Sequence, residues 1–291
     1  MRLPVPVHLF AAFFCCVVPG LRAQIIPEAL RDFPVQTESV EYDNLTTLRA
    51  LPNYNALKQR FSGKPLERLK TALTQIDVQE SEVAEIAMAT SPTGFYGLIS
   101  GAFNGVAVTQ NALKKGCSFI DVKQDKILVA TSEMSILFLN DSIAAFGTPA
   151  QIESMLKARD GVEPRLNTKT SLAHLLNQTD PNAPVRGISS GSRIAASLSD
   201  AIQGETSLNL DWSRLASNIS AFNYSVKLDT KAHVVARLQC QSSATAAVLR
   251  QTLSALGALQ SLAAAPPFEN LEVSLSGVFV DLKMDTPLPA S

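Results

Sequence analysis

Strict alternation of apolar and polar residues in the C-terminal half is the feature that most restricts the fold. Apolar residues occupy every second position from residue 222 to 228 and again from 234 to 240, where Val235 is the exception. A period of two places alternate side chains on opposite faces of a strand. Thr230 and Lys231 offer a short connection, so we predict an antiparallel hairpin.

The following segment predicts a helix and a second hairpin. Residues 243–264 carry leucines at helical spacing with polar residues opposite, and Pro266-Pro267 ends the segment. Alternation returns over residues 271–275 and 278–284, on either side of Ser276-Gly277.

Helix caps organise the first half. Residues 65–73 predict a short amphipathic helix. Asn104 is suited to cap a helix that ends at Gly116, and Thr148 followed by Pro149 begins a helix that ends at Gly161. We predict strands at residues 35–42, 83–89, 95–99, 118–122, 126–131, 134–140 and 142–146.

Both halves follow one order of elements: strand, helical segment, hairpin, helix, hairpin. In the second half the strand is 185–187 and the first helix is 192–202. We therefore predict an α+β fold with two related halves, residues 35–165 and 166–285, that arose by duplication, and a tail at 286–291. Each half is expected to form mostly antiparallel sheet with helices packed on one face.

Residues 1–23 have the layout of a secretory signal peptide. Arg2 precedes an apolar run at 5–18, Pro19-Gly20 breaks the run, and Ala23 precedes Gln24. The run is shorter than the about 20 residues that a membrane span needs, although retention as an anchor is the alternative. We expect export to the periplasm or the exterior, a linker at residues 24–34, and no membrane span after cleavage.

Composition limits the possible partners. Hydrophobic residues make up 46% and charged residues 18%, which suits a folded core and argues against disorder. The net charge of −1 gives no basic excess for nucleic acid. In an oxidising compartment Cys117 and Cys240 could form a disulfide; two free thiols are the alternative.

Residues 95–161 carry a set of turns and caps. The segment reads "GLISGAFN", then a helix ending "ALKKGC", then strands leading to "ILFLNDSIAAFGTPAQIESMLKARDG", with Asp141-Ser142 before the last strand. This pattern resembles an uncharacterised family of exported bacterial proteins, whose members share the Gly-x-Phe-Asn/Asp turn and the Gly-Thr/Ser-Pro corner. The resemblance implies a fold and a compartment, and it implies no activity.

One motif suggests catalysis. Gly187-Ile188-Ser189-Ser190-Gly191 matches Gly-x-Ser-x-Gly, the turn that presents a nucleophilic serine in α/β-hydrolases. Ser189 would need His233, the one downstream histidine, as its base, oriented by Asp200, Asp211 or Asp229. Because the surrounding elements are hairpins and His233 lies within a strand, a capped turn is the preferred interpretation.

The sequence predicts no cofactor and no metal site, since His174 and His233 lie far apart and outside any ligand spacing. We expect a non-enzymatic protein that binds a protein partner or a small ligand through a sheet face or the cleft between the halves. A serine hydrolase and a carrier of lipid or hydrophobic cargo are the alternatives. The following polar residues argue against deep lipid burial: Asn223, Ser225, Lys227, Asp229 and Arg237.

Overall fold

The structure is a computed structural model that describes residues 25–61, 64–122, 124–168, 170–191, 193, 217–260 and 268–288. The predicted signal peptide lies outside these residues. So does the expected helix at 192–202, apart from Arg193.

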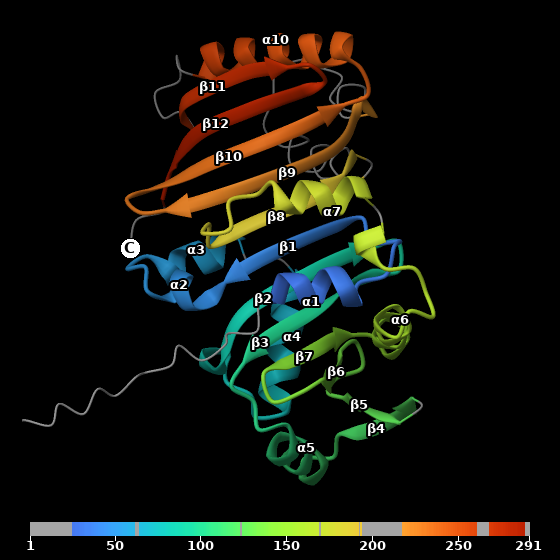
Figure 1. Cartoon of the computed structure of the whole chain (residues 1–291). Coiled ribbons are helices and arrows are strands. Elements are labelled where there is room, and N and C mark those ends of the chain that lie inside the picture. The colour runs from blue at the N-terminus through green and yellow to red at the C-terminus, as the bar shows by residue number, and fades with distance from the viewer. Residues whose placement is uncertain are drawn as a thin grey trace, which may run out of the picture.

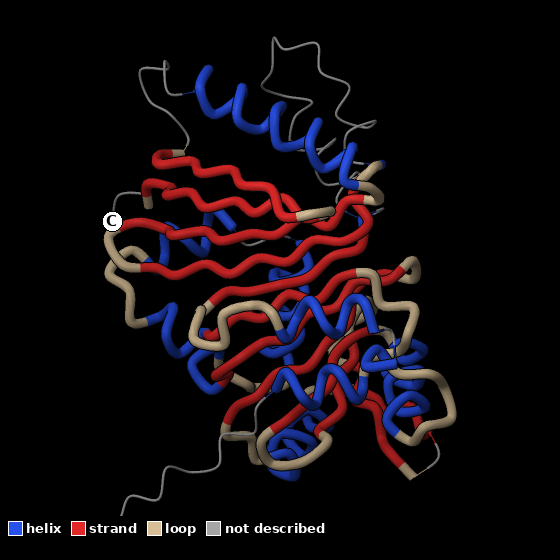
Figure 2. The backbone as a smooth tube through the Cα atoms, turned by 45° about the horizontal axis from the view of Figure 1, so that its top comes forward, coloured by secondary structure: helices blue, strands red, loops and turns tan. Residues whose placement is uncertain are grey.

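Within the described residues, twelve strands form one antiparallel sheet that runs the length of the molecule (Figures 1 and 2). The order across the sheet is β11-β12-β10-β9-β8-β1-β2-β3-β7-β6-β5-β4. The strands are β1 (Ser39–Asn44), β2 (Val83–Ser91), β3 (Gly94–Gly101), β4 (Ser118–Val122), β5 (Asp125–Val129), β6 (Ser135–Phe138), β7 (Ile143–Gly147), β8 (Val185–Ser190), β9 (Ile219–Leu228), β10 (Lys231–Cys240), β11 (Glu269–Ser276) and β12 (Phe279–Pro287).

The two halves of the chain use the same strand order. Outward from the centre, the first half reads β1-β2-β3-β7-β6 and the second reads β8-β9-β10-β12-β11. The halves meet at β1 and β8, which pair antiparallel from Ser39 opposite Ser189 to Asp43 opposite Val185. The hairpin β4–β5 extends the first half alone. The expected α+β class with antiparallel sheet is confirmed, and the halves share one continuous sheet.

Helices cover both faces of this sheet, where the sequence predicted one covered face. On the face drawn in front in Figure 1, α1 and α6 pack on β2, β3 and β7 through Ala87, Leu98 and Ala145, and α7 packs on β8 and β9. On the other face α4 and α5 pack on Ile86 and Ile99 and on their neighbours in β6 and β7. The helices are α1 (Ile25–Asp32), α2 (Leu45–Arg49), α3 (Tyr54–Phe61), α4 (Lys64–Gln75), α5 (Gly105–Lys114), α6 (Pro149–Arg159), α7 (Thr170–Asn177) and α10 (Ser243–Gln260), with 3-10 turns η1 (Glu80–Glu82) and η2 (Leu166–Thr168).

The helix α1 corrects the predicted linker at residues 24–34. Ile25, Ala29 and Phe33 recur at intervals of four residues and are buried against α6 and the sheet. The ring of Phe33 meets that of Tyr96 edge-on at 5.5 Å. This spacing indicates an amphipathic helix. The pattern covers few residues, because the helix is only eight residues long.

The predicted caps are present. The side chain of Asn104 accepts a hydrogen bond from the Ala107 backbone N–H at 3.1 Å. Thr148 begins α6 with a reciprocal bond to Gln151. Gly116 and Gly161 have positive φ after α5 and α6, which ends each helix as expected.

In the second half α10 packs over β10, β12 and β11, on the same face as α4 and α5. The predicted tail is partly strand, because Thr286 pairs with Ala232 at the end of β12. Among the described residues, no helix has both the length and the apolar character that crossing a membrane requires.

Candidate functional site

A pocket of about 670 Å³ lies between the helices α2–α4 and the sheet face formed by β1, β8, β9 and β10. Both halves contribute apolar walls. The first half supplies Leu45, Leu48, Leu57, Leu66, Leu69, Leu73, Val78, Val83 and Ile86, and the second supplies Val185, Val226, Leu228, Ala232, Val234 and Leu288. The volume falls in the range of sites that bind small molecules.

The alternation in β9 decides which side chains reach the pocket. Tyr224, Val226 and Leu228 line it, whereas Asn223 and Ser225 point to the opposite face. There the amide of Asn223 donates to the Leu175 carbonyl at 2.9 Å, and Ser225 Oγ accepts from the Asp180 N–H at 2.8 Å. Two of the polar residues that argued against an apolar site, Asn223 and Ser225, therefore anchor α7 and the loop after it.

Two carboxyl groups lie at the sheet side of the pocket. Glu41 and Asp43 are two residues apart on β1 and share one face, with their Cα atoms about 7 Å apart along the strand. The hydroxyl of Tyr224 donates to Glu41 Oε2 at 2.6 Å. Gly187 lies between these residues in the register, and a Cβ there would come within 2.7 Å of the Tyr224 ring. The glycine lets the ring cross β8 to reach the first half.

The side chain of Asp43 makes no hydrogen bond or ion pair with any residue that the structure describes. Burial, and next the charge of Glu41, raise the pKa of Asp43 well above its ordinary value. Burial and the Glu41 charge also raise the pKa of Tyr224, which keeps its proton on the phenol. The pocket therefore contains one carboxylate held by a tyrosine and one carboxyl group without a protein partner.

A second tyrosine–carboxylate pair lies on the helical side of the pocket. Tyr54 donates to Glu80 Oε1 at 2.8 Å, and burial followed by this bond raises the pKa of Tyr54. Arg49 donates to the Glu80 carbonyl at 2.6 Å and so ties α2 to η1. These bonds connect the short helices α2 and α3 to the segment that precedes β2.

The sheet register does not bring Ser189 and His233 together, which corrects the serine-hydrolase arrangement. Ser189 is in β8 on the face that carries Glu41, whereas His233 is on the opposite face of β10. The Ser189 hydroxyl donates to the Ser190 carbonyl at 3.2 Å. The expected turn is strand through Ser190, and a Cβ on Gly191 would lie 1.6 Å from the Ile219 carbonyl oxygen. Packing accounts for both glycines of the motif.

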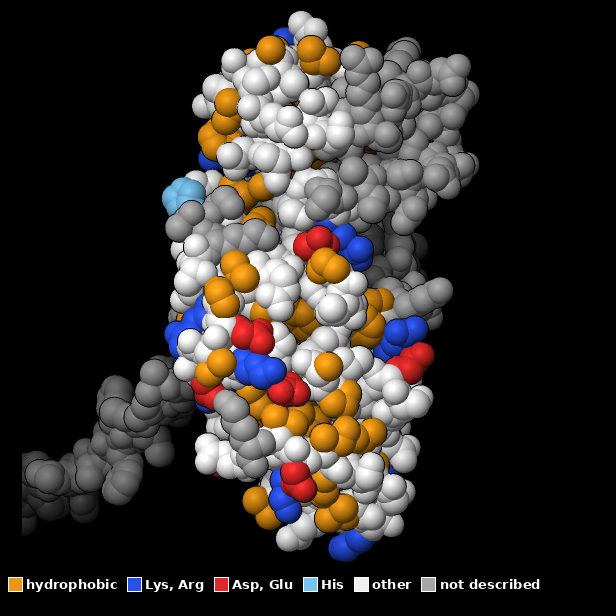
Figure 3. Space-filling view, turned by 90° about the vertical axis from the view of Figure 1, so that its right-hand side faces the viewer, with side chains coloured by type: hydrophobic (Ala, Val, Ile, Leu, Met, Phe, Trp, Pro, Cys, Tyr) orange, Lys and Arg blue, Asp and Glu red, His pale blue; other side chains and the backbone are white. Residues whose placement is uncertain are grey.

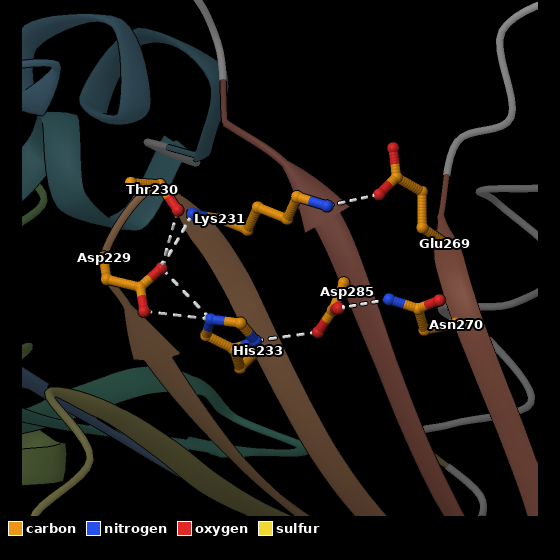
Figure 4. A network of polar contacts seen from close by, with 7 residues as sticks. All are labelled: Asp229, Thr230, Lys231, His233, Glu269, Asn270 and Asp285. Atoms are coloured by element: carbon orange, nitrogen blue, oxygen red, sulfur yellow. Dashed lines mark hydrogen bonds and ion pairs between the residues drawn. The ribbon is translucent and has the colours of Figure 1, made fainter.

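His233 and Asp229 do lie together, within a surface network (Figure 4). The imidazole Nδ1 is 2.7 Å from Asp285 Oδ1, and Nε2 is 3.0 Å from Asp229 Oδ1. Asn270 donates to the second oxygen of Asp285 at 2.8 Å, and Lys231 pairs with Glu269. The bonds to Asp285 and then Asp229 raise the pKa of His233 above 6.5. The network joins β10, β12 and β11 on the face away from the pocket.

Of the two alternatives for the cysteines, the structure has free thiols at both Cys117 and Cys240. Cys117 packs in the cluster beneath α4 and α5, whereas Cys240 is buried in the cluster beneath α10. These clusters are at opposite ends of the sheet. Among the described residues, no three His, Cys, Asp or Glu side chains gather in a way that could hold a metal ion.

Sequence reasoning did not find Glu41, Asp43 or Tyr224. The available signal was the order Val40-Glu41-Tyr42-Asp43, which puts acidic side chains on one face of a strand in the middle of an apolar fold. On the surface drawn in Figure 3, basic and acidic side chains lie side by side without an extended area of one charge.

The fold is similar to that of a solved protein. A chain described as the structure of crystal form I of TP0453 superposes with a TM-score of 0.53 and 9% sequence identity, over 89% of this chain and 91% of that chain. At this identity the likeness concerns the fold alone. No family model matches the sequence, and no curated protein matches it.

Proposed function

We propose that this chain is an exported, non-enzymatic protein that binds an apolar small molecule in the pocket between its two halves. The pocket carries the proposal, because it is concave, has a volume of about 670 Å³ and is lined mainly by leucine, isoleucine and valine. Concave apolar walls with a few convergent polar groups are typical of sites for small ligands. The proposed export rests on the signal-like segment at residues 1–23.

Two neighbouring valines on β10 allow a matched test. Val234 lines the pocket, whereas Val235 is 51% exposed on the opposite face. Val234→Trp should fill part of the pocket and weaken binding of the apolar fluorescent probe N-phenyl-1-naphthylamine by about tenfold or more, which corresponds to ~1.4 kcal/mol. Val235→Trp should leave binding unchanged. Absence of probe binding by the wild-type protein, or equal binding by both variants, contradicts the proposal.

A further inference from the structure

The pocket wall carries more acidic than basic side chains, and this excess affects which ligands it can accept. The described wall carries four carboxyl groups, on Glu41, Asp43, Glu67 and Glu80, and one ammonium group, on Lys70. The carboxyl groups of Glu41 and Asp43 lie on β1, on the sheet side of the pocket. Lys70 is exposed on α4 at the opposite side.

Asp43 is the group whose position is hardest to explain by the fold alone. Glu41 has the Tyr224 hydroxyl as its donor, and Glu80 has the Tyr54 hydroxyl. Asp43 has neither a donor nor a cation among the residues that the structure describes. The Asp43 side chain is half-buried at the pocket wall, and withdrawing a carboxyl group from water is costly unless it is paired or hydrogen-bonded. A ligand that donates to Asp43 would remove this cost.

We infer that the pocket selects an amphiphile whose head group is a protonated amine, with the ammonium between Glu41 and Asp43 and the apolar chain along the walls of α4 and β9–β10. This inference rests on the proposed function. An alkylammonium has three N–H donors, enough to reach both carboxyl groups at once. An anionic head group would meet the charge of Glu41 at the same place and would be repelled.

The test compares three ligands that share a ten-carbon chain: decylamine, decanol and decanoate, each used below its micelle concentration. Each displaces N-phenyl-1-naphthylamine from the wild-type protein. A charge-assisted hydrogen bond contributes roughly 10- to 100-fold in affinity, so decylamine should displace the probe at about tenfold lower concentration than decanol. Decanoate should be the weakest of the three.

Asp43→Asn removes the acidic group that would give its proton up against a bound ammonium, and it keeps the shape of the side chain. In this variant the preference for decylamine over decanol should fall to about threefold or less, while decanol binds as before. Glu41→Gln should weaken decylamine in the same direction and keeps an acceptor for Tyr224. Glu272→Gln, at an exposed carboxyl group on the opposite sheet face, is the matched control and should change nothing.

The possible results separate the two proposals. Failure of the wild-type protein to bind the probe rejects the proposed function and the inference together. Probe binding with equal displacement by all three ligands, or an amine preference that survives in Asp43→Asn, rejects the inference and leaves the apolar pocket intact. Tighter binding of decanoate would assign the head group to Lys70 and would also overturn the inference.

Discussion

The hydroxyl of Tyr224 donates to the carboxylate of Glu41 at 2.6 Å across an intervening strand. Glu41 belongs to the first half of the chain and Tyr224 to the second. Gly187 stands between them in the register and leaves room for the tyrosine ring. A hydrogen bond between the two halves thus crosses β8 at the wall of the pocket. The absence of a side chain at Gly187 makes room for it.

This contact predicts a measurable coupling between Gly187 and Tyr224. Gly187→Ala would push a methyl group against the ring and should lower the free energy of unfolding by about 1–3 kcal/mol. In a Tyr224→Ala background the same change should cost much less, because the ring is gone. A double-mutant cycle by urea unfolding measures the difference. Equal costs in both backgrounds would show that the ring does not limit residue 187.

The hydroxyl alone can be tested with Tyr224→Phe. A hydrogen bond to a charged group contributes about 1.5–3 kcal/mol, so this variant should be less stable by an amount in that range. The ring and its apolar contacts remain, which separates the bond from the packing. Unchanged stability in urea unfolding would mean that the bond to Glu41 contributes nothing in solution.

Phe33 tests whether α1 belongs to the folded core. Phe33 is fully buried, and Phe33→Ala should lower the free energy of unfolding by about 3–5 kcal/mol. Val162→Ala is the matched control, since Val162 is 67% exposed and should change stability by no more than about 0.5 kcal/mol. Similar unfolding midpoints for the two variants would restore the linker interpretation of residues 24–34.

His233 should titrate above its ordinary pKa of 6.5, because Asp285 and Asp229 both stabilise the imidazolium. A raised pKa in the folded state means that the contribution of His233 to stability is complete below pH 6.5. It is lost as the pH rises through the raised pKa. The pKa values of Asp285 and Asp229 are lowered from 3.8, so their contributions are lost as the pH falls below that value.

The network should therefore be strongest between about pH 4 and pH 6.5. An NMR titration of the His233 ring follows its pKa directly, and Asp285→Asn should move that pKa back toward 6.5. Because the side chains of His233 and Asp229 are 41% and 64% exposed, the effect on overall stability should be small. A wild-type His233 that titrates at or below 6.5 contradicts the network.

The free thiols predict that a reducing agent leaves thermal stability unchanged. Cys117 and Cys240 lie in separate core clusters, and burial raises the pKa of Cys240. Cys240 should thus react slowly with a thiol reagent until the protein unfolds. Thermal unfolding with and without reductant, together with thiol counting in denaturant, checks both points. A lower melting temperature in reductant would indicate a disulfide.

Local signals in the sequence predicted local structure well. Asn104 and Thr148 identified the starts of α5 and α6, and the alternation around Thr230 identified the hairpin β9–β10, since caps and turns depend on neighbouring residues. The predicted strand at 35–42 is displaced, because residues 34–37 form a turn in which Thr37 bonds to the Pro34 carbonyl and β1 begins at Ser39.

The pocket could not be predicted from the sequence, because it depends on pairings between distant segments. Glu41 and Tyr224 meet only through the register of β1 on β8 and of β8 on β9. Alternation shows that the two faces of β9 differ, but it does not show which helices cover each face. The register of β8 on β9 and of β9 on β10 also places Ser189 and His233 on opposite faces of the sheet. A local motif contains no information about strand register.

The ladder between β1 and β8 also limits how this molecule can move. Five consecutive residue pairs join the halves there, from Ser39 with Ser189 to Asp43 with Val185. The halves therefore cannot swing apart like the lobes of a hinged binding protein without breaking backbone hydrogen bonds. A change in the width of the pocket would instead have to come from the helical wall, where α2, α3 and α4 face a sheet that this ladder holds in one piece.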